Sequence, residues 1–145
     1  MARAQEGGAL SAASLDSLMS LYEATPESDS GIVRLCYYIA KRQGNVDSTI
    51  IWAQRLERLS NMHGKPEMKC EAYGFLSWAY YYNPVGLKNF EYIDKGIDLA
   101  DSIGDIGLKA YFLYIMGYNY FSILDFRQAD KSYSHAITLF SQISD

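Results

Sequence analysis

Residues 116–136 of this 145-residue chain read MGYNYFSILDFRQADKSYSHA. Apolar residues recur every three to four positions on both sides of Leu124-Asp125, which is the periodicity of an α-helix. The interruption therefore predicts two helices, over about 106–123 and 127–142. Small and aromatic residues hold fixed positions in this pair: Gly117, Tyr120, Phe126, Ala129, Tyr133 and Ala136.

The same periodicity predicts five further helices. They lie over 10–25, around 32–39, around 50–59, and over 67–82 and 87–102. No segment keeps the two-residue alternation of a strand for long, and no Asn-Gly hairpin signal occurs. We therefore predict an all-α fold of about seven helices, preceded by a flexible lead-in over residues 1–9.

The helices recur in pairs when the sequence is shifted along itself by 40 residues. The shift places Gly117 on Ser77, Tyr120 on Tyr80, and Ala136 on Gly96. A lone helix over 10–25 is then followed by three helix–turn–helix units, at about 30–66, 70–104 and 110–145. We expect one domain, because the chain is short for two.

The last unit resembles a tetratricopeptide repeat (TPR). The resemblance rests on Met116-Gly117-x-x-Tyr120, Asp125-Phe126 and Ala129-x-x-x-Tyr133-x-x-Ala136. It implies a right-handed α-α superhelix in which Gly117 and the alanines let paired helices approach closely, while the aromatic residues fill the spaces between them. The middle unit keeps Tyr80 and Gly96, the first unit keeps little, and the 40-residue period exceeds the usual 34.

The layout of one short helix, a Thr-Pro-Glu loop and then repeats is similar to the N-terminal sensory region of TPR proteins in the Bacteroidetes. That resemblance implies the input region of a bacterial signal-transduction or transcription-regulatory protein, with a kinase or DNA-binding output elsewhere. Ala2-Arg3-Ala4 before Gln5 fits a signal-peptidase pattern, which favours the periplasm or cell envelope over the cytoplasm.

The composition excludes several classes of function. Apolar residues make up 49% of the chain and charged residues 21%, so a folded chain is expected. The net charge of −4 argues against direct nucleic-acid binding, and no run of 18 apolar residues could span a membrane. We expect no enzyme, cofactor or metal, because no HExxH, Gly-x-Ser-x-Gly or P-loop motif occurs. Cys36 and Cys70 are expected to be buried apolar residues, with a disulfide between them as the alternative.

The resemblance also implies a concave face lined by the first helix of each pair, where a protein or peptide would bind. The residues at the matching positions are Arg34, Tyr38, Lys41, Arg42, Glu71, Trp78, Tyr81, Tyr82, Tyr111, Tyr114, Tyr118 and Phe121. The last four recur at i, i+3, i+7 and i+10 on one helix face. Three interpretations of this aromatic stripe stay open: it is buried, it is a peptide groove, or it is a homodimer face.

The final helix carries a second apolar stripe, formed by Tyr133, Ala136, Ile137 and Phe140. One side of it packs on the preceding helix, and the other has no further repeat to cover it. We therefore expect the chain to be part of a longer protein and to form a homodimer through its last helix pair. The alternative to a peptide-binding scaffold is accordingly a structural oligomerisation module.

Overall fold

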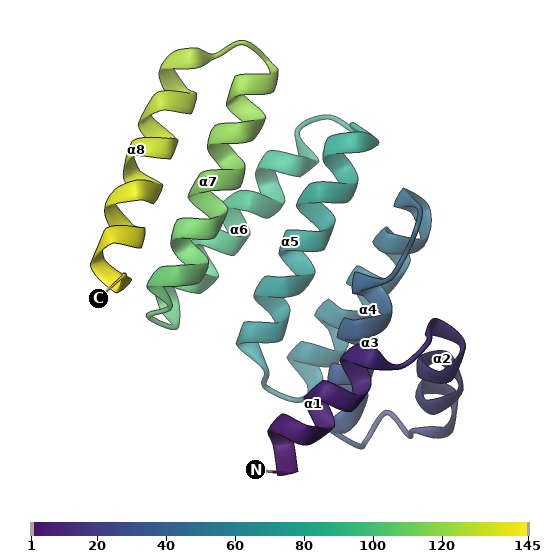
Figure 1. The fold of residues 1–145 in the computed structure, drawn as a ribbon. Helices are drawn as coiled ribbons and strands as arrows, with labels where there is room; N and C mark the ends of the chain where they lie inside the picture. Colours follow the sequence, from purple (N-terminus) through teal and green to yellow (C-terminus); the bar gives the residue numbers. More distant parts are fainter. Residues whose placement is uncertain (1, 145) are drawn as a thin grey trace. The chain divides into compact units, whose positions relative to one another are not determined.

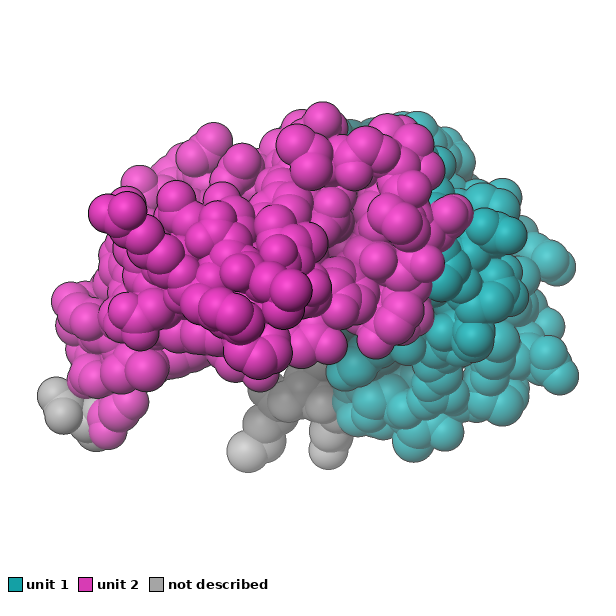
Figure 2. Space-filling view, turned by 90° about the horizontal axis from the view of Figure 1, so that it is seen from above, with its two compact units in different colours: residues 1–75 teal, residues 76–145 magenta. Residues whose placement is uncertain are grey.

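The computed structural model describes residues 2–144, and over that range every regular element is an α-helix (Figure 1). The described chain divides into two compact units, one ending at Phe75 and the other beginning at Leu76. Figure 2 colours the two units separately. The division falls inside helix α5, Pro66–Tyr82, so this helix contributes residues to both units.

The first unit contains α1 (Ala2–Ala12), α2 (Leu15–Ala24), α3 (Gly31–Lys41), α4 (Val46–Met62) and the start of α5. Helix α3 packs against α4, α2 and α1. The core of this unit includes the fully buried side chains of Leu18, Ile32, Cys36, Ile39, Leu56 and Leu59. The side chains of Ser14 and Asn45 accept hydrogen bonds from the first turns of α2 and α4, so these polar residues fix where the helices begin.

The second unit contains the end of α5, α6 (Lys88–Ser102), α7 (Ile106–Ser122) and α8 (Phe126–Ile143). Helix α7 packs against both α6 and α8. Each contact is made close by a glycine. A Cβ added to Gly96 would lie 2.4 Å from the Phe112 ring, and one added to Gly117 would lie 2.7 Å from the Tyr133 ring.

The predicted all-α fold of neighbouring helix pairs is confirmed, and the predicted helix bounds from 67 onward lie within a few residues of α5 to α8. The helix count differs, because residues expected in a flexible lead-in form α1, and the described range holds eight helices. Glycine has the lowest helix propensity after proline, so Gly7 and Gly8 argue against a helix in this part of the sequence. Packing against α3 overrides that local preference.

Both cysteines are buried, as expected, and no disulfide joins them. Burial raises the pKa of the Cys36 thiol to about 12, so this sulfur stays protonated in the core. Among the helices that the structure describes, none is both long and apolar enough to cross a membrane.

Candidate binding surface

An exposed group of aromatic side chains lies on the second unit, and we call it the aromatic patch. Its members are Trp78, Tyr81 and Tyr82 of α5 and Tyr111, Tyr114, Tyr118 and Phe121 of α7. Trp78 is 47% exposed and Tyr114 is 51% exposed, so the rings are neither buried in the core nor fully extended into solvent. Six of the seven side chains are exposed, and Tyr81 is half-buried.

The spacing of the residues places these rings on one side of each helix. On α7 the four aromatic residues recur at the helical period, whereas Ala110, Leu113 and Gly117 on the other side are buried. That buried side packs on α6 and α8. Helix α7 therefore has two apolar sides, and only one of them is used by the core of the unit.

Ring contacts connect four members of the patch across α5 and α7. The Trp78 and Tyr82 rings lie 5.1 Å apart, the Tyr81 and Tyr82 rings 5.0 Å, and the Tyr81 and Tyr118 rings 5.4 Å. The pKa of Tyr118 is raised, mainly by a side-chain hydrogen bond with Tyr81. The patch therefore combines apolar ring faces with neutral hydroxyl groups, which can donate and accept hydrogen bonds.

The predicted packing residues of the last helix pair have two different outcomes. Gly117, Ala129 and Ala136 are buried, and Tyr133 packs over Gly117. The Tyr120 ring lies 4.9 Å from the ring of Phe90 on α6.

Phe126 does not belong to this packing set, because it is 57% exposed. It is the first residue of α8, and its ring lies 5.5 Å from the ring of Phe121 at the end of α7. The α7–α8 turn holds the ring at the margin of the aromatic patch, so its packing contact is with an exposed ring and not with the core.

Two of the predicted groove residues in the first unit are engaged by the chain itself. The Tyr38 hydroxyl donates a hydrogen bond to the Gly7 carbonyl oxygen, with an O···O distance of 3.3 Å. The Arg42 guanidinium donates to the carbonyl oxygens of Ser11 and Ala13. The expectation that Tyr38 and Arg42 line an open groove is therefore wrong, because α1 lies over them.

The remaining predicted residues of the first unit lie in different surroundings. Lys41 is exposed, and its ammonium group lies 5.8 Å from the centre of the Tyr37 ring. Glu71 is half-buried, and burial raises the pKa of its carboxyl group, while the charge of Lys41 acts in the opposite direction. Arg34 is half-buried and lines a pocket.

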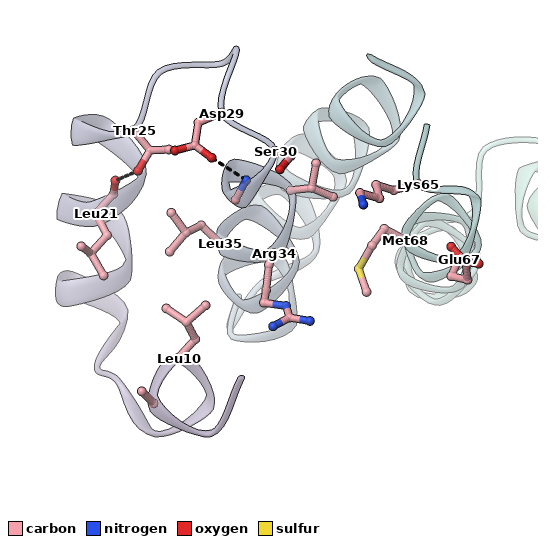
Figure 3. Close-up of a pocket in the computed structure, with 13 residues that line it drawn as sticks. Leu10, Leu21, Thr25, Asp29, Ser30, Arg34, Leu35, Lys65, Glu67 and Met68 are labelled. Atoms are coloured by element: carbon pink, nitrogen blue, oxygen red, sulfur yellow. Dashed lines mark hydrogen bonds between the residues drawn. The ribbon is translucent and has the colours of Figure 1, made fainter. Parts of the chain in front are cut away.

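That pocket has a volume of about 600 Å³ and lies within the first unit (Figure 3). Figure 3 shows Leu10, Leu21 and Leu35 on one side and Lys65, Glu67 and Met68 on the other, with Arg34 between them. Among its polar groups, Asp29 accepts a hydrogen bond from the Gly31 amide. Of the lining residues, only Arg34 was predicted as a site residue, because the pocket is built from segments far apart in the chain that share no motif.

Within the described range, no three His, Cys, Asp or Glu side chains come together in a way that could hold a metal ion. No protein-family model and no curated protein matches the chain.

Proposed function

We propose that the chain is a non-catalytic scaffold that binds a protein or peptide on the aromatic patch of its second unit. The observation that supports this function is the exposed set of rings that extends from α5 to α7. The same two helices bury their other sides in the unit, so the core does not need these rings. As the resemblance to TPR proteins implies, the scaffold would serve as the input region of a bacterial signalling or regulatory protein.

The chemistry of the patch suits a peptide with apolar side chains. Tyrosine and tryptophan offer large contact areas, have few rotatable bonds to immobilise on binding, and carry a polar group at one end. Trp78 and Tyr114 lie on different helices, so a peptide that contacts both would cross the patch from α5 to α7. Such aromatic residues are the most frequent hot spots of protein interfaces.

The test is to select peptides on the purified chain from a random library displayed on phage, and to measure their affinity for variants. We expect Trp78→Ala and Tyr114→Ala each to weaken the selected peptides by tenfold or more, because hot-spot truncations typically cost about 2 kcal/mol or more. Ile51→Ala on α4 is the control, since it removes an exposed apolar side chain outside the patch. Unchanged melting temperatures would show that the fold is intact.

The two tryptophans allow an independent measurement. Trp52 is 7% exposed, whereas Trp78 is 47% exposed, so Trp52→Phe leaves a single fluorescent reporter in the patch. A selected peptide should then protect Trp78 from quenching by acrylamide. Peptides that bind all variants equally and leave the quenching unchanged would refute the proposed surface.

A second candidate function is self-association through α8. Ile137 of α8 is 65% exposed, and Phe140 and Ile143 on the same helix are exposed as well. These residues lie at i, i+3 and i+6, so they share one side of the helix.

A further inference from the structure

Residues 7–13 lie against α3, and they contact it through their backbone. The carbonyl oxygens of Gly7, Ser11 and Ala13 accept hydrogen bonds from Tyr38 and Arg42. Residues Ser11 and Ala13 lie at the C-terminal end of α1, where helix carbonyl groups lack partners within the helix. Arg42 therefore satisfies free carbonyls and places a positive charge at the negative end of the α1 dipole.

Helix α1 has little stability of its own. It contains 11 residues, and isolated helices of that length are marginal in water even when they are rich in alanine. Gly7 and Gly8 each cost about 1 kcal/mol relative to alanine inside a helix. Its first turn has no acidic residue and its last turn no basic residue, so the helix lacks charges that would favour its own dipole.

The side chains described for α1 are those of residues 7–12, and they add little to the contact with α3. Gly8, Ala9, Ser11 and Ala12 are exposed, and within this range Leu10 packs partly against the core of the first unit. Ala9 and Leu10 also form part of the wall of the pocket shown in Figure 3. Local opening of a segment with so few buried apolar contacts requires much less free energy than global unfolding.

We propose that α1 is a detachable cover, and that the surface of α3 beneath it binds a short helix of another chain. The partner is defined by what α1 presents here: small residues and free carbonyl groups at a helix C-terminus, which complement the positive charge of Arg42. When α1 leaves, this surface exposes the donors of Tyr38 and Arg42, and the pocket loses the part of its wall formed by Ala9 and Leu10. This inference concerns the first unit and is independent of the aromatic patch.

The test uses the full chain and a fluorescein-labelled synthetic peptide with the sequence of residues 1–14. Two double variants change the stability of α1 in opposite directions. Gly7→Ala/Gly8→Ala strengthens the helix, and both added methyl groups fit, since the nearest atom to either Cβ is 3.7 Å away. Ala9→Gly/Ala12→Gly weakens the helix at two exposed positions.

We expect the weakened variant to bind the peptide roughly tenfold more tightly than the wild type, and the strengthened variant to bind it roughly tenfold more weakly. The reason is that the tethered helix and the peptide compete for one surface, so the apparent affinity follows the uncovered fraction. Adding Arg42→Gln to the weakened variant should abolish the binding. Trp78→Ala should leave it unchanged, which separates this surface from the aromatic patch.

Hydrogen exchange on the same chains gives a second measurement. The α1 amides should exchange much faster than those of α3 in the wild type, and should become protected in the strengthened variant. The proposal is overturned if the α1 amides are as protected as those of α3. Equal peptide affinity for the strengthened and weakened variants would overturn it as well.

Discussion

Gly117 lies where α7 comes closest to α8, and a Cβ at this position would meet the Tyr133 ring at 2.7 Å. Both the ring and the helix backbone would have to shift, and overpacking of this kind typically costs about 1–3 kcal/mol. We therefore expect Gly117→Ala to lower the free energy of unfolding by that amount in chemical denaturation.

Gly107 provides a matched control on the same helix, because a Cβ there would make only ordinary contacts at 3.5 Å. Gly107→Ala should be neutral or stabilise the chain by up to about 1 kcal/mol, since alanine has the higher helix propensity. Equal losses in the two variants would mean that the contact with Tyr133 is not the cause of the loss at Gly117.

Glu71 should make the stability of the first unit depend on pH. Burial raises the pKa of its carboxyl group, so the folded state keeps the proton to a higher pH than the unfolded chain does. The free energy of unfolding therefore falls as the pH rises from the ordinary value of 4.5 through the raised value. Glu71→Gln removes this loss because glutamine has no charge to bury.

We expect Glu71→Gln to raise the melting temperature at about pH 7 and to change it little at about pH 3, where the carboxyl group is protonated in both states. Melting curves of the two chains across this range check the sign. A gain that is larger in acid than at neutral pH would contradict the assignment of burial as the dominant effect.

Single residues differed in how well the sequence could place them. The resemblance to the TPR motif implied a close approach at Gly117, and the Tyr133 ring lies against that glycine. Arg42 left no signal of its contacts in the sequence, since its carbonyl partners come from a helix that the propensity of Gly7 and Gly8 conceals. Phe126 has the residue type of a core position, and only the geometry of the preceding turn shows that it is exposed.

At the scale of elements, the turns after α4, α6 and α7 share one backbone conformation but not one residue type. Gly64 and Gly104 adopt φ of 60° and 70° after α4 and α6, and Leu124 adopts 64° after α7. A left-handed conformation is favourable for glycine and costs other L-residues about 1–2 kcal/mol. Leu124 is also 72% exposed, so little burial offsets this strain.

We expect Leu124→Gly to raise the free energy of unfolding by about 1 kcal/mol, the relief of strain being partly offset by the greater freedom of glycine in the unfolded chain. Leu124→Ala is the control, because it shortens the side chain and keeps the strained φ. Denaturation of both variants distinguishes the effects. A gain in the alanine variant equal to that of the glycine variant would show that removal of the exposed side chain is responsible.

Most elements could be predicted because their starts and ends have local chemical causes. Asp105 and Asp125 follow the turns and accept hydrogen bonds from the first turns of α7 and α8, which marks both helix starts in the sequence. Helix α1 has no such polar residue at its start that the pattern could reveal, and its contact with α3 depends on tertiary packing. The pocket of the first unit was missed for the same reason.

At the scale of the whole molecule, the exposed side of α8 predicts self-association. Ile137, Phe140 and Ile143 leave apolar area in water that pairing with a second copy would remove. We expect sedimentation at micromolar concentration to show a dimer, and Ile137→Glu/Phe140→Glu to return it to a monomer. Trp78→Glu, which places the same charge in the aromatic patch, should leave the dimer intact. A monomeric wild type would exclude this interface.

The 40-residue period relates successive helix pairs, whereas the two compact units divide inside α5. Periodicity reports which residues occupy equivalent positions in successive helix pairs. It does not report how densely those pairs contact one another, and that density defines the units. The helices were therefore predictable from sequence and the division between the units was not.

The position of that division restricts how the chain can be cut or recombined. Boundaries between compact units usually fall in exposed linkers, where proteases cleave and where evolution joins one module to another. Here the boundary between Phe75 and Leu76 is helical, and each unit takes part of the same helix. A chimaera joined at residue 75 would require two half-helices from different parents to continue as one. A working chimaera must therefore take the whole of α5 from one parent. The contacts of α5 with residues from the other parent must then be rebuilt.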